Sequence, residues 1–249
     1  MATTKQRRRQ RAREKWERQQ QQRRAKVVRQ RKLALAVVLA IVVVGALVLA
    51  LGAWLPGADD AEPDAAADDG CVYTETEPID GIGLPPSDPV TATTATVTLD
   101  GAPVTIELFD TEAPCTVGSL VHLANLGYFD DSTCHRVTTS PTLRVLQCGD
   151  ATGDGTGPGY QFGLENIAEA TYEAGTVAMA RRQTDPNSNG SQFFLVYEDS
   201  QLAPEYTVFG RITDGLDVIT AIAERGTADG SEDGPPAEPV TIDTLVAGP

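Results

Sequence analysis

Lysine is absent from the chain after Lys32, and the only fixed cations beyond that point are six arginines. Histidine occurs twice, and the four cysteines include no Cys-x-x-Cys pair, so the sequence offers no typical ligand set for a zinc site. The glycine-rich stretch 153–159 lacks the Lys-Ser/Thr pair that a phosphate-binding loop needs. We therefore expect neither a metal ion nor another cofactor.

The basic residues are concentrated at the N-terminus. Residues 1–32 hold 14 Lys and Arg against Glu14 and Glu17, a net charge of +12 in a chain whose total is −15. Residues 33–55 carry no charged side chain. As a helix rising about 1.5 Å per residue they would span about 34 Å, enough for a hydrocarbon core of about 30 Å. The pattern predicts one transmembrane helix, with a signal peptide cleaved near residues 50–52 as the alternative.

The charges on either side of the apolar segment predict its orientation. Lys and Arg flank its N-terminal side, whereas residues 58–70 hold six acids and no base. This asymmetry predicts a single-pass protein of the cell membrane with a cytoplasmic N-terminus and an extracytoplasmic C-terminal domain. The basic arm, residues 1–32, would lie at an anionic inner leaflet. Nucleic acid is not expected as its partner, since the arm has one aromatic residue, Trp16, and no base-reading module.

Residues 56–90 are rich in Ala, Asp, Pro and Gly and show little apolar periodicity, which predicts an acidic, flexible linker. All four cysteines, Cys71, Cys115, Cys134 and Cys148, follow the apolar segment, where an oxidising compartment permits disulfides. Two bridges are expected, and three pairings are open. A bridge from Cys71 would pin the end of the linker to the domain.

Residues 91–249 have the size of one domain with a single core. Alternating segments predict short strands, and Asp100-Gly101 between the first two predicts a hairpin turn. The expected strands are 95–99, 104–108, 134–138, 143–147, 176–180, 192–196, 207–212 and 240–245. Apolar stripes predict one helix that starts near Pro114 and stops at Gly127, and a second over 216–223. This order favours a mainly β fold, an antiparallel barrel capped by helices.

The segment Asn187–Phe194 combines small, amide and aromatic side chains in one short window. Asn and Gly favour turn conformations, and the alternation that follows predicts a strand with Gln192 and Phe194 on one face. Taken alone, the window is as typical of a hairpin turn with a core aromatic as of a ligand groove.

Seven further motifs accompany this window. They are Val104–Asp110, Ala113–Thr116, Gly127–Asp130, His135–Val137, Gln147–Asp150, Gly175–Ala180 and Thr207–Arg211. In order and spacing the set resembles the cyclophilins, a family of peptidyl-prolyl cis-trans isomerases, and most closely their exported or membrane-anchored bacterial members. The resemblance covers residues 91–249. It implies a closed eight-stranded antiparallel β-barrel capped by two α-helices, here preceded by one transmembrane helix, with a proline-binding groove on the outer face.

By motif position the resemblance implies functional roles for individual residues. The implied catalytic set is Arg136, Gln147, Gln192 and Phe194. The implied substrate-binding positions are Val145, Ala180, Leu202 and Tyr206.

Two arginines, Arg144 and Arg181, are added to the substrate-binding candidates on charge. Four of the domain's six arginines map to the implied groove, while residues 91–249 hold 23 acids. This distribution favours a positive groove in an acidic shell, which would concentrate segments with Asp or Glu near proline. Incidental salt bridging is the alternative.

The sequence departs from the family pattern at the groove. Leu143–Val145 stand where the family commonly has Phe-Met at the pocket floor, and Tyr206 stands where many members have His. Gln201 takes the place of a frequent Trp, and the loop that begins at Arg181 is two residues longer than usual. The altered pocket floor leaves a binding function open besides catalysis, and the long linker and acidic face leave an adhesion or scaffold role open.

The favoured function is isomerisation of Xaa-Pro bonds in exported proteins, outside the cytoplasmic membrane. Twisting an amide moves no covalent bond, so this function needs differential binding of a twisted amide rather than a nucleophile or a cofactor. The expected partners of a monomer are proline-containing polypeptide segments and, through residues 33–55, the membrane. The first alternative is a tethered module that binds proline segments without turnover, and the second is an adhesion or scaffold protein.

Overall fold

The computed structural model describes residues 70–248. The expected basic arm, the expected transmembrane helix at 33–55 and residues 56–69 of the expected linker lie outside this range. Between residues 70 and 248, no helix combines the length and the apolar character that a bilayer crossing requires.

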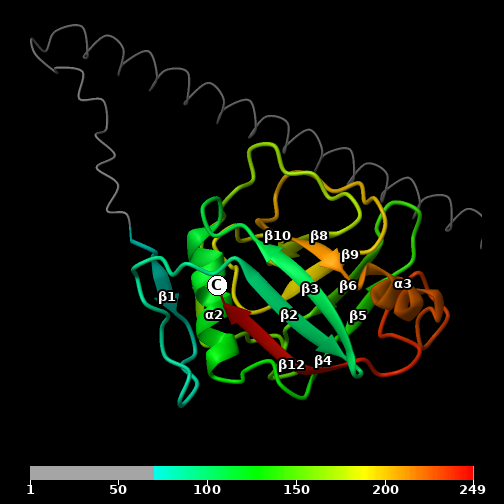
Figure 1. The fold of residues 1–249 in the computed structure, drawn as a ribbon, viewed down its shortest axis with the longest axis horizontal. Coiled ribbons are helices and arrows are strands. Elements are labelled where there is room, and N and C mark those ends of the chain that lie inside the picture. Colours follow the sequence, from blue (N-terminus) through cyan, green and yellow to red (C-terminus); the bar gives the residue numbers. More distant parts are fainter. Residues whose placement is uncertain (1–69, 249) are drawn as a thin grey trace, which may run out of the picture. The chain divides into compact units, whose positions relative to one another are not determined.

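One antiparallel sheet of ten strands dominates the described residues (Figure 1). Neighbouring strands follow the order β11-β5-β6-β9-β8-β10-β3-β2-β12-β4. In chain order these strands are β2 (Thr94–Leu99), β3 (Ala102–Leu108), β4 (Ser132–Thr133), β5 (Arg136–Thr138), β6 (Val145–Cys148), β8 (Thr176–Met179), β9 (Phe193–Val196), β10 (Val208–Asp214), β11 (Asp233–Gly234) and β12 (Thr241–Gly248). A separate pair consists of β1 (Tyr73–Glu75) and β7 (Tyr160–Phe162).

The hairpin expected at Asp100-Gly101 joins β2 to β3, with Leu99 opposite Ala102. Both turn residues have positive φ, 48° at Asp100 and 82° at Gly101. A two-residue turn with positive φ at both positions matches the twist of the flanking strands, and Asp-Gly is among the pairs that adopt it most readily. The sequence prediction is confirmed here at the level of the turn itself.

Two helices, α2 (Pro114–Asn125) and α3 (Leu216–Glu224), begin and end close to the expected residues. Pro114 suits the first turn of α2, because its missing N–H would have no partner inside the helix. Both helices add apolar side chains to the main core, with Val117 and Leu120 from α2 and Ile219 and Ile222 from α3. The core packs these helices against one face of the curled sheet.

The sheet forms an open, curled half-barrel, which corrects the expectation of a closed eight-stranded barrel. In the described part of the chain the ladder of paired strands ends at β11 and at β4. β5 already has β11 on its outer side, with Asp233 opposite Thr138, so its edge is occupied. Only Cys134 and His135 separate β4 from β5 in the chain. The backbone therefore crosses from β4 to β5 without a ladder between these two strands.

Residues 70–90 differ from the flexible linker that their composition predicts. Tyr73–Glu75 pairs with β7, and the Tyr73 hydroxyl donates to the carbonyl oxygen of Cys115 over 2.7 Å. The Tyr73 ring meets Tyr160 and Phe162 edge-on, with centroids 5.6 and 5.5 Å away. These contacts supply the burial that the segment cannot provide by itself.

The disulfides join Cys71 to Cys115 and Cys134 to Cys148, one of the three pairings left open by the sequence. The first attaches the N-terminal segment to the start of α2. The second links the residue that follows β4 to the last residue of β6. Each bond therefore fixes a junction that short strands alone hold weakly.

Candidate functional site

The two faces of β9 belong to different apolar clusters. Phe193 and Leu195 lie in the main core, whereas Phe194 and Val196 join a second cluster on the other face of the sheet. Buried members of the second cluster are Val145, Tyr172, Ala178, Phe194, Val196 and Val208, with Phe109, Leu143, Ala170, Ala180, Leu202 and Tyr206 packed against them. Four expected substrate-binding residues and Phe194 are thus brought together.

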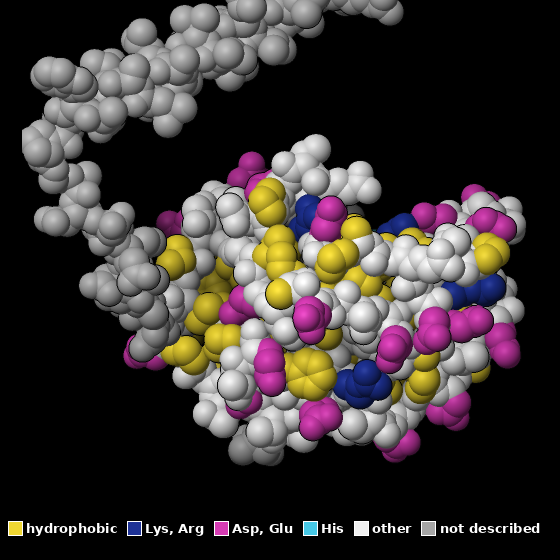
Figure 2. Space-filling model, turned by 90° about the horizontal axis from the view of Figure 1, so that it is seen from above, with side chains coloured by type: hydrophobic (Ala, Val, Ile, Leu, Met, Phe, Trp, Pro, Cys, Tyr) yellow, Lys and Arg dark blue, Asp and Glu magenta, His cyan; other side chains and the backbone are white. Residues whose placement is uncertain are grey.

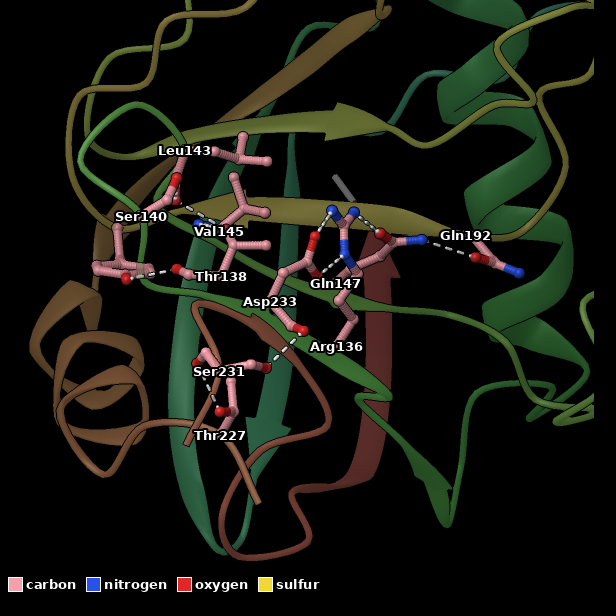
Figure 3. A network of polar contacts seen from close by, with 11 residues as sticks. Arg136, Thr138, Ser140, Leu143, Val145, Gln147, Gln192, Thr227, Ser231 and Asp233 are labelled. Atoms are coloured by element: carbon pink, nitrogen blue, oxygen red, sulfur yellow. Dashed lines mark hydrogen bonds and ion pairs between the residues drawn. The ribbon is translucent and has the colours of Figure 1, made fainter. Parts of the chain in front are cut away.

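A chain of hydrogen bonds runs along the edge of this cluster (Figure 3). Arg136 on β5 lies opposite Gln147 on β6, and its Nη1 donates to the Gln147 Oε1 over 3.0 Å. The Gln147 Nε2 donates in turn to the Oε1 of Gln192 over 2.9 Å. The structure therefore joins three of the four residues expected to be catalytic in one polar network.

Gly149 allows β6 to end close to the Gln192 backbone. Its φ is +87°, and an added Cβ would lie 2.3 Å from the carbonyl oxygen of Ser191. A side chain at this position would push the two segments apart, so only glycine permits Gln147 and Gln192 to meet at hydrogen-bond distance.

Asp233, which the sequence analysis did not identify, binds the other side of the Arg136 guanidinium. Its two carboxylate oxygens accept from the Arg136 Nε over 2.6 Å and from Nη2 over 2.7 Å. Hydrogen bonding from Arg136 lowers the pKa of Asp233, and the same bond raises the pKa of Arg136. Both groups are therefore ionised in the neutral pH range, and they form a bidentate ion pair.

Tyr206 forms an aromatic corner of the second cluster. Its ring meets Phe194 edge-on at 5.6 Å and Tyr172 edge-on at 6.1 Å. The Tyr172 hydroxyl donates to the Tyr206 carbonyl over 3.0 Å and accepts from the Tyr206 amide over 2.9 Å. Tyr172 was not predicted as a site residue, and burial raises its pKa. Its two backbone contacts fix the loop that carries Tyr206.

Arg181 packs against Tyr206 at this aromatic corner. Its side chain is only 6% exposed, and its Nη2 lies 2.7 Å from the Glu205 carboxylate. Its Nε donates to the Glu205 carbonyl, and its guanidinium carbon lies 5.2 Å from the centre of the Tyr206 ring. Arg181 thus holds the loop at 180–183 against the loop that carries Tyr206.

Arg144 is not brought together with the other candidates. It directly precedes Val145, so the two side chains point to opposite faces. Its Nε lies 3.6 Å from Glu198, and its side chain lies beside Tyr197, which belongs to the main core. Alternation along the strand accounts for this separation.

A cavity of about 440 Å³ adjoins the second cluster. Gln147, Gln192 and Ala180 contribute to its lining, together with Arg181 and Arg182. Its far wall comes from the N-terminal segment, at residues 76–77, and from the glycine-rich stretch 154–158. The glutamines therefore lie between an apolar cluster and an open hollow, an arrangement suited to an extended peptide.

Ion pairs oppose the expected positive groove. Each of the six arginines in residues 70–248 has a carboxylate within 4.0 Å. Arg182, whose side chain is 63% exposed, pairs with Asp185 and also donates to the Gln161 side chain. The groove is thus lined by neutralised pairs, which favours the alternative of salt bridging.

The described residues contain no cluster of three or more His, Cys, Asp and Glu side chains with the geometry of a metal site. The candidate site combines the Arg136 guanidinium, the amides of Gln147 and Gln192 and the apolar cluster around Phe194. Such groups can bind and orient a peptide, and a guanidinium can donate to a nitrogen or oxygen lone pair.

Comparison with known proteins identifies relatives of this chain. The family model described as cyclophilin type peptidyl-prolyl cis-trans isomerase/CLD matches residues 93–247. The probable peptidyl-prolyl cis-trans isomerase B of Mycobacterium tuberculosis is 48% identical over 178 residues, which cover 66% of this chain and 57% of that protein. The peptidyl-prolyl cis-trans isomerase B of Bacillus subtilis is 41% identical over 121 residues, 47% of this chain and 81% of that protein. The match thus spans little more than half of the mycobacterial relative.

Solved structures share the fold. A cyclophilin type peptidyl-prolyl cis-trans isomerase of Cryptosporidium parvum has a TM-score of 0.55 and 25% identity, covering 64% of this chain and 99% of that chain. A second crystal structure of that protein, determined in the presence of the dipeptide Ala-Pro, has a TM-score of 0.54 and 26% identity, covering 63% and 99%.

Proposed function

The chain belongs to the family of cyclophilin-type peptidyl-prolyl cis-trans isomerases, and from this premise we propose that it catalyses cis-trans isomerisation of Xaa-Pro peptide bonds. The observation that carries the proposal is the hydrogen-bonded series Arg136, Gln147 and Gln192 beside the apolar cluster around Phe194. The presence of an Ala-Pro dipeptide in a related crystal structure supports proline as the residue bound.

Arg136 would act on the prolyl nitrogen. Amide resonance delocalises the nitrogen lone pair and sets a rotation barrier of about 18–20 kcal/mol. Twisting the bond localises that lone pair, so it accepts a hydrogen bond more strongly in the transition state than in the ground state. A guanidinium N–H directed at the nitrogen therefore stabilises the twisted state selectively, and each 1.36 kcal/mol of such stabilisation is about a tenfold gain in rate.

The apolar cluster would hold the proline ring, and the glutamines would hold the flanking backbone. Phe194, Val145 and Leu202 present apolar side chains on one face of the sheet. Gln147 and Gln192 each carry a donor and an acceptor, which can pair with peptide groups on either side of the proline. Fixing both sides of the bond leaves rotation about the bond itself as the remaining freedom.

The proposed place of action is outside the cytoplasmic membrane, on exported proteins. The uncharged segment 33–55 and the basic residues before it support a membrane anchor with an internal N-terminus. Two disulfides support an oxidising compartment for the domain. Protease treatment of intact cells tests this, since an external domain is degraded while the basic arm stays protected. Protection of the domain in intact cells would exclude the proposed orientation.

The activity is tested by a protease-coupled assay of an Ala-Pro peptide with the full-length chain in detergent. We expect catalysis by the wild type and a loss of about hundredfold or more in kcat/KM for Arg136→Ala, the scale of removing one transition-state donor. Arg211→Ala is the matched control, because Arg211 pairs with Glu173 and takes no part in the series of Arg136. A wild-type rate no higher than that of Arg136→Ala would exclude the activity.

A binding module without turnover is the second candidate. The aliphatic residues Leu143 and Val145 favour it, since they line the apolar cluster at a place where the resemblance implies an aromatic residue and methionine. Peptide binding by wild type and Arg136→Ala with equal affinity, without turnover by either, would support this function over catalysis.

A further inference from the structure

The Arg136 guanidinium is held on two sides. It has five N–H groups, of which Asp233 receives two and Gln147 receives one. Two N–H groups are left, one on each terminal nitrogen. Both terminal nitrogens lie at the end of the side chain, beyond the Nε that faces Asp233 (Figure 3).

Asp233 is itself fixed by the backbone around it. It lies on β11, opposite Thr138 of β5, so a strand pair places it beside Arg136. The Ser231 hydroxyl donates to the Asp233 carbonyl over 2.9 Å, and the Thr227 hydroxyl donates to the Ser231 carbonyl over 2.6 Å. The segment 227–233 therefore forms a hydrogen-bonded loop that presents one carboxylate to the guanidinium.

We propose that Asp233 is a positioning residue, which sets the plane of the Arg136 guanidinium so that a free N–H group meets the lone pair of the prolyl nitrogen. The proposal rests on the isomerase function proposed above. It adds a role for the loop 227–233, which lies 97 residues from Arg136 at its point of contact.

Stability does not account for the pair. The side chains of Arg136 and Asp233 are 36% and 55% exposed. Ion pairs at such exposure are screened by water and contribute little to folding. A bidentate contact, by contrast, fixes the plane of a long and flexible side chain, which is what a directed hydrogen bond to a substrate needs.

Charge and orientation predict opposite effects when the carboxylate is neutralised. Asp233→Asn removes a negative charge beside Arg136 and so raises the net positive charge at the site. If charge were the useful quantity, kcat would rise. If the orientation of the guanidinium is the useful quantity, kcat falls, because an amide has one acceptor oxygen and turns its own N–H groups towards those of arginine.

The experiment compares Asp233→Asn with the wild-type full-length chain in the Ala-Pro assay. We expect kcat to fall about tenfold with KM within about twofold of the wild type, since misplacement of a catalytic group affects the chemical step more than binding. Glu238→Gln is the matched control. It removes the ion pair with Arg225, in the segment that follows β11, without a contact to Arg136, and it should retain the wild-type kcat.

A second readout does not depend on turnover. The Nε–H resonance of Arg136 in NMR spectra is assigned as the one lost in Arg136→Ala. We expect it to exchange slowly with solvent in the wild type and fast in Asp233→Asn. Should Asp233→Asn fail to fold, Asp233→Glu replaces it, because it keeps the charge but displaces it by one methylene. We expect this variant to show a smaller fall in kcat and a smaller rise in the exchange rate of the Nε–H resonance.

Unchanged or raised kcat in Asp233→Asn, or an equal fall in Glu238→Gln, would overturn the positioning role. So would an Nε–H resonance that exchanges at the same rate in wild type and variant. A wild type without turnover would remove the proposed isomerase function instead, and the resonance would then decide whether Asp233 fixes Arg136.

Discussion

At the scale of single residues, two adjacent phenylalanines of β9 have separate tasks. Phe193 is 1% exposed and packs in the main core, with its ring centre 5.9 Å from that of Phe129. Phe194 points to the other face, where it meets Tyr206 and Tyr172. Alternation along the strand thus places a core side chain and a candidate substrate-binding side chain next to each other in sequence.

Substitution of each phenylalanine by leucine separates these tasks. Phe194→Leu is expected to raise KM for an Ala-Pro peptide about tenfold, because the ring surface that faces proline is lost. Phe193→Leu is expected to lower the free energy of unfolding by about 1–2 kcal/mol and leave KM unchanged. Steady-state kinetics and urea denaturation measure both. A similar rise in KM for both variants would contradict the division of the two faces.

The residue scale also shows where sequence reasoning stops. Arg136, Gln147 and Gln192 lie in motifs that resemble a known family, so the sequence alone predicts them as site residues. Asp233 lies in an acidic, glycine-containing stretch that resembles a surface loop, and nothing local distinguishes it from Asp229. Its contact with Arg136 spans 97 residues of the chain, which no short-range pattern encodes. Arg144 lies beside Glu198 and Tyr197, away from the other candidates, which charge alone does not predict because it says nothing about the face of a strand.

At the scale of elements, α2 depends on a cap from outside its own sequence. Its N-cap residue, Ala113, has no side chain that can accept a hydrogen bond. Glu165 accepts from the backbone N–H of Cys115 over 2.9 Å and from that of Thr116 over 2.7 Å. A carboxylate at this place satisfies unpaired N–H groups and faces the positive end of the helix dipole.

Glu165→Gln is therefore expected to lower the free energy of unfolding by about 1–3 kcal/mol, the scale of hydrogen bonds to a charged group. Glu169→Gln is the control, since Glu169 is an exposed residue of the same loop, and its effect should stay within about 0.5 kcal/mol. Urea denaturation followed by circular dichroism measures both. Equal stability of the two variants would mean that Glu165 does not cap the helix.

Element prediction succeeded where a period is long enough to read. The residues of β3 alternate over seven positions, and α2 carries an apolar stripe over three turns, so both were predicted with nearly correct bounds. β1, β7 and β11 have three residues or two, too few to show any period. Their partners lie far away in the chain, and β11 in particular occupies the edge that a closed barrel would have used. The open barrel thus follows from β11, a strand that the sequence pattern does not predict.

At the scale of the whole molecule, the domain surrounds a neutralised groove with excess negative charge. Residues 91–249 carry 23 acids and six arginines, and each arginine is already paired. Acidic side chains are spread over the face seen in Figure 2, among few basic ones. The domain's net charge is therefore negative, and we expect a negative field around the groove, the opposite of what the arginine positions indicate from sequence.

Peptides with lysine next to Ala-Pro are accordingly expected to show a KM several-fold lower than peptides with aspartate there, at low ionic strength. The difference should vanish at about 1 M salt, where the Debye length is about 3 Å. Turnover of the two peptide series at both salt concentrations measures this. A lower KM for the aspartate series at low salt would contradict this expectation and support a positive groove.

The disulfide between Cys71 and Cys115 also determines how the domain carries mechanical load. A pull that arrives along the chain from residues before Cys71 passes through the sulfur atoms to the start of α2. β1 follows Cys71 in the chain, so it lies off this route and is not peeled from β7. The strands that carry Arg136, Gln147 and Phe194 lie off it as well. In a domain attached in this way, force applied through its N-terminal end does not load the strands of the candidate site.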